Sequence, residues 1–166
     1  MKKLHIVRET TKHVTMVPEH ELSRTRGREV VNLLEIETDM KAMLFAINEE
    51  KFPGEHRAGY ALAHHQVARE HFRFFVVADK WAKMFGGHKV MLNPKFVSVD
   101  REIEEREGCL SHPYRGTRLV KRRNSVFAEW ETPEFKKVEM QLEGLAARIF
   151  LHEYDHTIGK TIWLKP

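Results

Sequence analysis

The clearest pattern of hydrophobic and polar positions lies near the end of the chain. At about 100° per residue, the helical period, several side chains between residues 142 and 159 fall on one face. This face carries apolar residues together with two histidines and a glutamate: Leu142, Leu145, Ile149, His152, Glu153 and His156. The pattern predicts a helix over 142–159 that turns this face inward and ends near Gly159. Residues 160–164 are then expected to return as a short strand.

A second helix is predicted over residues 38–48. Apolar residues recur there at helical spacing, namely at Met40, Met43, Leu44 and Ile47. Thr38 or Asp39 can cap the start of this helix. An apolar stripe of this kind is typical of a helix that packs against a core.

Shorter apolar runs bounded by turn residues predict β-strands. They lie at residues 4–7, 13–17, 72–78, 88–94, 96–99, 125–130 and 135–140. Residues 18–27 read as an exposed loop, and residues 59–67 fit a strand or a loop edge. The acidic run 101–107 is expected to form a solvated bend.

Length and composition narrow the class of protein. A chain of 166 residues is most simply one domain over residues 1–166, and 42% hydrophobic with 31% charged residues is typical of a globular protein. No apolar run is long enough to span a membrane or to act as a signal peptide, so we expect no membrane partner and a cytoplasmic location. One cysteine excludes an internal disulfide. The net charge of +4 names no partner, although the basic stretch 115–123 could contact RNA phosphates if it is not simply a solvated loop or strand edge.

Candidate chemistry lies on the predicted helix 142–159. His152 and His156 are four residues apart, so both imidazoles can reach one metal ion, and Glu153 beside them is a candidate general base. The alternative is an amphipathic helix with surface histidines. A catalytic metal normally takes three protein ligands, so a third is needed from elsewhere. The single cysteine, Cys109, can supply it as a thiolate.

Three ordered motifs resemble those of the peptide deformylases. That family carries GxGxAAxQ, then EGCLS, then QHExDHLxG, which stand here as GYALAHHQ (59–66), EGCLS (107–111) and LHEYDHTIG (151–159). With the flanking text, the resemblance covers about residues 38–160. The chain departs from the family pattern at Ala61, His64, Leu151 and Thr157.

The resemblance implies a fold, an activity and a metal site. The fold is α+β, with antiparallel β-sheets surrounding a central HExxH helix, and the activity is removal of the formyl group from N-terminal formylmethionine of new polypeptides. One divalent ion per chain, natively often Fe²⁺ and otherwise Zn²⁺, Ni²⁺ or Co²⁺, is held by Cys109, His152 and His156. Glu153 moves the proton, while the side chain of Gln66 and the backbone N–H of Leu110 stabilise the oxyanion.

The same resemblance implies where substrate lies. N-formylmethionyl peptides run as an added strand beside Gly59 and Ala61. The methionine pocket is expected to be lined by Tyr60, Leu145 and Ile149, with Arg148 at its mouth. Transient contact with the ribosome through 115–123 is a further expectation, and the location is the cytoplasm, or an organelle or host cytoplasm that initiates with formylmethionine.

The same residues are compatible with three other functions. The first is a deformylase-like enzyme for another N-acyl group, and the second is a non-catalytic binding protein of the same fold. The third is a zinc endopeptidase, because HExxH is shared with that class. It typically needs a downstream Glu or His ligand, and the residues after His156 contain neither.

Overall fold

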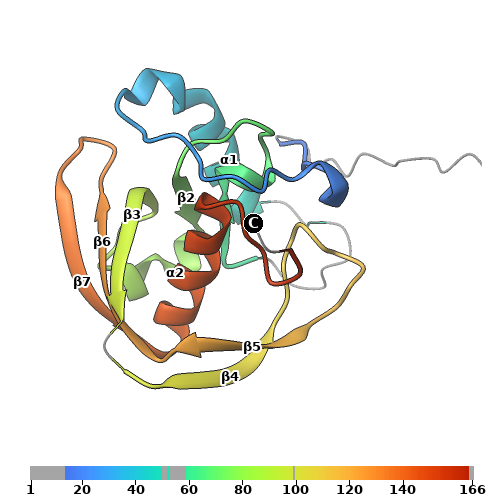
Figure 1. Ribbon diagram of the computed structural model, residues 1–166. Helices are drawn as coiled ribbons and strands as arrows, with labels where there is room; N and C mark the ends of the chain where they lie inside the picture. The colour runs from blue at the N-terminus through green and yellow to red at the C-terminus, as the bar shows by residue number, and fades with distance from the viewer. Residues whose placement is uncertain (1–13, 50–51, 53–58, 99, 165–166) are drawn as a thin grey trace, which may run out of the picture.

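The computed structural model describes residues 14–49, 52, 59–98 and 100–164 (Figure 1). Two α-helices are present among them, α1 (Glu37–Glu49) and α2 (Gly144–Thr157). The strands are β1 (Ala61–Ala63), β2 (Phe74–Val77), β3 (Val90–Ser98), β4 (Glu102–Glu107), β5 (Arg118–Arg123), β6 (Ser125–Glu131) and β7 (Lys137–Glu143). Short 3₁₀ turns are η1 (Glu19–Glu21), η2 (Leu33–Glu35), η3 (His64–Gln66) and η4 (Asp79–Phe85).

All paired strands in the two sheets run antiparallel. One sheet has the order β1-β2-β3-β6-β7, and the second consists of β4 and β5. Figure 1 shows α2 in the middle of the molecule, with β3, β6 and β7 to one side and the β4–β5 pair passing beneath it. The α+β architecture with a central helix, expected from the motifs, is confirmed.

Strand β2 explains why a helix covers each face of the larger sheet. Successive strand residues point to opposite faces, and all of β2 is buried. Phe74 and Val76 pack in one apolar cluster with α1, whereas Phe75 and Val77 pack in a second cluster with α2. Helix α2 therefore lies between the face of the sheet that carries Phe75 and Val77 and the β4–β5 pair.

Several element predictions are corrected by the structure. The helix predicted over 142–159 begins only at Gly144, because Leu142 belongs to β7 and Gly144 turns the chain with a φ of 57°. Leu145 is 42% exposed and so does not face inward with the rest. The two runs predicted at 88–94 and 96–99 join in one strand, Val90–Ser98, with an irregularity at which Asn93 adopts a φ of 50°. The side-chain amide of Asn93 pairs there with the backbone of Val30.

Three further strand or bend predictions are wrong where the structure can test them. Residues 101–107 contain the strand β4 rather than a bend, while residues 14–17 and 160–164 form no strand. The run 4–7 lies outside the described residues. The other predicted strands and the helix over 38–48 are confirmed, with bounds shifted by a few residues. Among the described residues, no helix is long and apolar enough to cross a membrane.

Candidate metal centre

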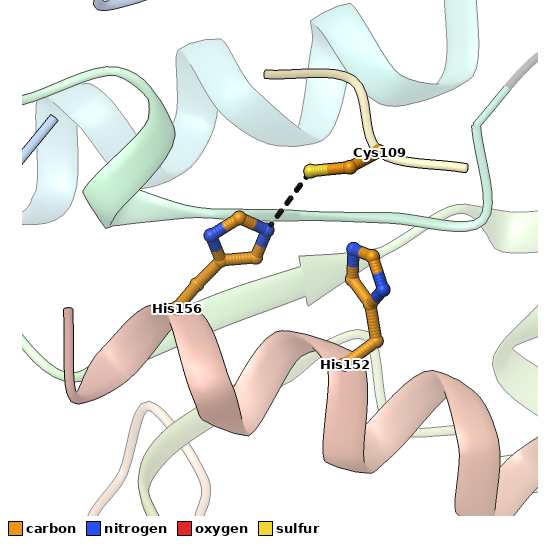
Figure 2. Close-up of side chains that lie close together, drawn as sticks. All are labelled: Cys109, His152 and His156. Carbon is orange, nitrogen blue, oxygen red and sulfur yellow. Dashed lines mark hydrogen bonds between the residues drawn. The ribbon is translucent and has the colours of Figure 1, made fainter. Parts of the chain in front are cut away.

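The two histidines of α2 and the single cysteine come together in the structure. One ligand atom from each of Cys109, His152 and His156 lies within 4.8 Å of the others. Figure 2 shows both imidazoles rising from the same side of α2 towards the sulfur of Cys109, which belongs to a different segment. Sγ of Cys109 is 3.4 Å from Nε2 of His156. Helical spacing supplies two of the three groups, and the loop after β4 supplies the third.

His152 is oriented by a buried carboxylate. Its Nδ1 lies 2.9 Å from Oε2 of Glu107, which leaves Nε2 for another partner. Arg122 donates two hydrogen bonds to the same carboxylate, and Arg148 donates one. Burial alone would raise the pKa of Glu107, but the hydrogen bonds from His152 and Arg122 outweigh it and lower that pKa to about 2. Glu107 is therefore a fixed negative charge behind His152.

The sequence patterns missed this carboxylate as a functional group. Glu107 ends a run predicted to be solvated, yet its side chain is 6% exposed. Arg122 likewise belongs to the basic stretch 115–123, but it is buried between Glu107 and Asp155. The only sequence signal for Glu107 is its place as the first residue of EGCLS.

His156 has a different outer partner. Its Nδ1 lies 3.0 Å from Nδ1 of His65, and Nε2 of His65 lies 2.7 Å from the backbone oxygen of Ser23. Burial, followed by the charge of neighbouring imidazoles, lowers the pKa of His156 well below its ordinary value. A neutral imidazole is the form that binds a metal.

Glu153 lies between the two histidines on α2 and is buried, with 4% exposure. No hydrogen-bond partner for its Oε2 is present in the part of the chain that the structure describes. Burial raises the pKa of Glu153 to about 7. A thiolate and two imidazoles form a donor set that transition metals prefer, and the unpartnered oxygen is suited to a cation or water beside it. The residues present fit a divalent metal.

Gln66 and Leu110 also lie at this cluster. Oε1 of Gln66 accepts a hydrogen bond from the backbone N of Ala63 at 2.9 Å, so its amide nitrogen points the other way. That nitrogen donates to Oγ of Ser111 at 3.0 Å and lies 3.9 Å from Sγ of Cys109. A Cβ added to Gly59 would lie 2.8 Å from Leu110, so glycine lets the first motif pack closely on the second.

The residues expected to line a pocket are less uniformly placed. Ile149 is buried in the same apolar cluster as Ala61. Tyr60 is 40% exposed and packs on Trp81, and Leu145 is exposed too. Arg148 is buried, and its guanidinium bonds to Glu107 and to the backbone oxygens of Ile103 and Val120. Its contacts join α2 to β4 and β5, which is a structural role.

His64, a departure from the family pattern, bonds away from the cysteine and the two α2 histidines. Its Nε2 lies 2.9 Å from Oδ2 of Asp39 on α1, and its Nδ1 accepts a hydrogen bond from the backbone N of Phe72 at 2.9 Å. The ring also stacks on Phe74. The imidazole of His64, which is larger than the family's alanine, therefore packs between η3 and α1.

Replacing His64 by alanine should lower stability rather than alter substrate choice. The change leaves the buried N–H of Phe72 without its acceptor, which should reduce the free energy of unfolding by about 1–3 kcal/mol. Asp39→Ala is a matched control, because Asp39 is 55% exposed and its loss should matter by under about 1 kcal/mol. Denaturant unfolding measures both. An altered peptide preference in His64→Ala at unchanged stability would instead put His64 in the substrate site.

Known proteins resemble this chain in sequence and in fold. A sequence model of the family described as Polypeptide deformylase matches residues 11–165. Peptide deformylase from Thermotoga sp. (strain RQ2) is 35% identical over 108 residues, which are 64% of this chain and 62% of the relative. Peptide deformylase from Karelsulcia muelleri is 29% identical over 128 residues, 76% of this chain and 67% of the relative. The first of these alignments thus spans less than two thirds of the relative's length.

Solved structures agree with the sequence matches. The crystal structure of peptide deformylase from Thermotoga maritima has a TM-score of 0.74 at 25% identity and covers 94% of this chain and all of its own. A peptide deformylase from the Vibrio parahaemolyticus bacteriophage VP16T, in complex with actinonin, has a TM-score of 0.66 at 29% identity. The match covers 86% of this chain and 93% of the phage protein. Because the family match extends over nearly the entire sequence and the fold agrees with it, the chain belongs to the peptide deformylase family.

Proposed function

We propose that this chain is a single catalytic domain that removes the N-formyl group from formylmethionine at the start of new polypeptides and releases formate. The observation that supports this most directly is the convergence of Cys109, His152 and His156, with the buried Glu153 between the two histidines on α2. A catalytic metal ion normally takes three protein ligands, and one thiolate with two imidazoles can supply all three. This activity is useful only where protein synthesis begins with formylmethionine. The location would therefore be the cytoplasm of a bacterium, an organelle, or the cytoplasm of a host cell that initiates in this way.

Cys109, His152 and His156 would hold one divalent ion. Thiolate and imidazole donors suit Fe²⁺, which we propose as the native ion, and they also suit Zn²⁺, Ni²⁺ and Co²⁺. When bound, such an ion acts as a Lewis acid that polarises a carbonyl and lowers the pKa of water. Glu107 keeps Nε2 of His152 available by hydrogen bonding to Nδ1.

Glu153 would move the proton. A base should have a pKa near the working pH, because it must accept a proton from water and then donate it to the leaving amine. Burial places the pKa of Glu153 at about 7, which suits both steps.

Gln66 and Leu110 would stabilise negative charge on the formyl oxygen. The Gln66 amide has two N–H donors, and the bond from Ala63 to its oxygen fixes which way they point. One donates to Ser111 at 3.0 Å, and the other is directed at Sγ of Cys109 over 3.9 Å, a longer contact that it would exchange for the formyl oxygen of the substrate. Together with the backbone N–H of Leu110, it would supply the donors of an oxyanion hole, each typically contributing about 3–4 kcal/mol to the transition state.

The substrate peptide would add to the edge of the larger sheet. Strand β1 pairs only with β2 in that sheet, as far as the described strands show, so its other edge can accept an extended chain beside Gly59 and Ala61. The partly exposed side chains of Tyr60 and Leu145 and the buried side chain of Ile149 would contact the methionine.

Most of the basic stretch 115–123 is engaged within the chain. Arg115 pairs with Glu19, Arg118 bonds to the backbone oxygen of Ile162, and Arg122 is buried against Glu107. Lys121 stands opposite Glu104 in the β4–β5 register. Transient contact with the ribosome through the remaining exposed surface of 115–123 stays a prediction.

Substrate geometry tests the proposal. Formyl-Met-Ala-Ser should release formate, whereas the acetyl analogue should react about 10- to 200-fold more slowly, because an added methyl must fit a closed site. Internal bonds of blocked peptides should stay intact. Reaction at another acyl group would indicate the broader N-acyl enzyme, and cleavage of internal bonds without formate release would indicate an endopeptidase.

A further inference from the structure

His65 occupies a position of the first motif that the proposed reaction does not use, yet it contacts a proposed metal ligand. Its imidazole is buried, with 1% exposure, in the turn η3. The two ring nitrogens have different partners, His156 on one side and the backbone of Ser23 on the other. This pair of contacts forms a short chain of hydrogen bonds that ends at the metal centre.

The acceptor at one end fixes the direction of every bond in this chain. A backbone oxygen only accepts, so Nε2 of His65 must carry the proton that it donates to Ser23. In a neutral ring the other nitrogen, Nδ1, is then an acceptor. Nδ1 of His156 must therefore donate to it across the 3.0 Å contact. The lone pair of His156 is left on Nε2, the atom that faces Sγ of Cys109.

The carbonyl that starts the chain is itself held against α2. The backbone N of Gly27 donates to the oxygen of Thr157 at 2.9 Å. Gly159, at the end of α2, lies so close to Arg24 and Thr25 that a Cβ there would collide with their backbone. The residues just after Ser23 thus pack against the C-terminal end of α2, and His65 bonds to Ser23 on one side and to His156 on the other.

We propose that His65 is a positioning residue that holds His156 in the tautomer and orientation required of a metal ligand. The inference rests on the metal site of the proposed function. His152 and His156 are then supported differently, the first by the charged Glu107 and the second by a neutral imidazole with a backbone carbonyl behind it. Outer partners of metal-bound histidines typically change metal affinity about 10- to 100-fold when they are removed.

Metal affinity of three variants tests the proposal. His65→Phe keeps the ring and removes the acceptor, His65→Gln keeps both an acceptor and a donor, and His71→Phe is the matched control. His71 is also buried and contacts His65 edge to face, but it bonds to the oxygen of Thr157 rather than to a ligand. Competition between the protein and a chromophoric chelator for Zn²⁺ and Co²⁺ gives the dissociation constant, and thermal unfolding of the metal-free proteins reports structural damage.

His65→Phe should weaken binding of both ions about 10- to 100-fold, and His65→Gln should restore most of it. His71→Phe should bind metal like the unmodified chain, and the Co²⁺ absorption spectrum should change only in His65→Phe. Equal metal affinity in His65→Phe and the unmodified chain would overturn the proposal. So would losses in His65→Phe and His71→Phe that simply follow their losses of thermal stability.

A second measurement uses only the unmodified protein, so it tests the proposal even if His65→Phe does not fold. Long-range ¹⁵N–¹H correlation on the unmodified metal-free protein should show His156 protonated at Nδ1 and His65 at Nε2, and the reverse pattern would refute the inference. Failure of the proposed function has a different outcome. The unmodified chain would then bind metal with the predicted dependence on His65 but release no formate.

Discussion

Replacing Glu153 by alanine should leave one metal ion per chain in place and reduce formate release about 10²- to 10⁴-fold, the usual contribution of a positioned acid or base. The change removes the group that transfers the proton while sparing Cys109, His152 and His156. Metal analysis and the rate of formate release from formyl-Met-Ala-Ser measure the two effects on the same sample. Activity within a few-fold of the unmodified chain would assign the proton transfer to another group.

The pH profile of the rate gives an independent reading of the same residue. Glu153 acts as a base only when it is ionised, and burial places its pKa at about 7. A cation beside the carboxyl favours the ionised form and lowers that value. The rate should therefore rise with pH over a range that ends near or below 7, and this limb should be lost in Glu153→Gln, which keeps the shape of the side chain but cannot ionise.

The sequence predicted the central helix and the two histidine ligands because both depend on local order, whereas Cys109 was predicted as the single cysteine and as part of the EGCLS motif. The spacing of His152 and His156 fixes them on one face of α2, and this holds in the structure. The start of the helix was missed because Leu142 fits the helical period as well as it fits the end of β7. An apolar residue at such a junction satisfies both patterns, and pairing of β7 with β6 decides between them.

The outer partners of the site could not be found in this way, because they are set by contacts between distant segments. His65 and His156 are separated by 91 residues, and Glu107 reaches His152 only after β4 pairs with β5. The sequence does contain a signal for the pairing of β4 with β5. Acidic residues of 102–107 stand opposite basic residues of 118–123 in antiparallel register, such as Glu102 with Arg123 and Glu104 with Lys121. Opposite charges of this kind stabilise neighbouring strands, so two runs that look solvated separately predict a hairpin together.

Replacing Cys109 by alanine should remove most of the bound metal. Cys109 supplies the only sulfur of the proposed site, and the two histidines that remain are fewer than the three ligands that a catalytic metal normally takes. Metal analysis should show about one ion per chain in the unmodified protein and a small fraction of that in the variant. Formate release should fall in proportion to the metal lost.

The stability of the same two proteins separates a ligand from an inert buried thiol. Cys109 is 3% exposed, and alanine is a small apolar residue that fits its place, so the metal-free forms should unfold at similar temperatures. A metal present at about a thousand times its dissociation constant stabilises the folded chain that binds it by about 4 kcal/mol. Added Zn²⁺ should therefore raise the unfolding temperature of the unmodified protein and leave that of Cys109→Ala nearly unchanged. If added Zn²⁺ stabilised both proteins equally and the variant retained its metal, the ion would be held without the sulfur. A side chain that is not a ligand has no effect on how much the metal stabilises the protein, whereas the loss of a ligand reduces that stabilisation.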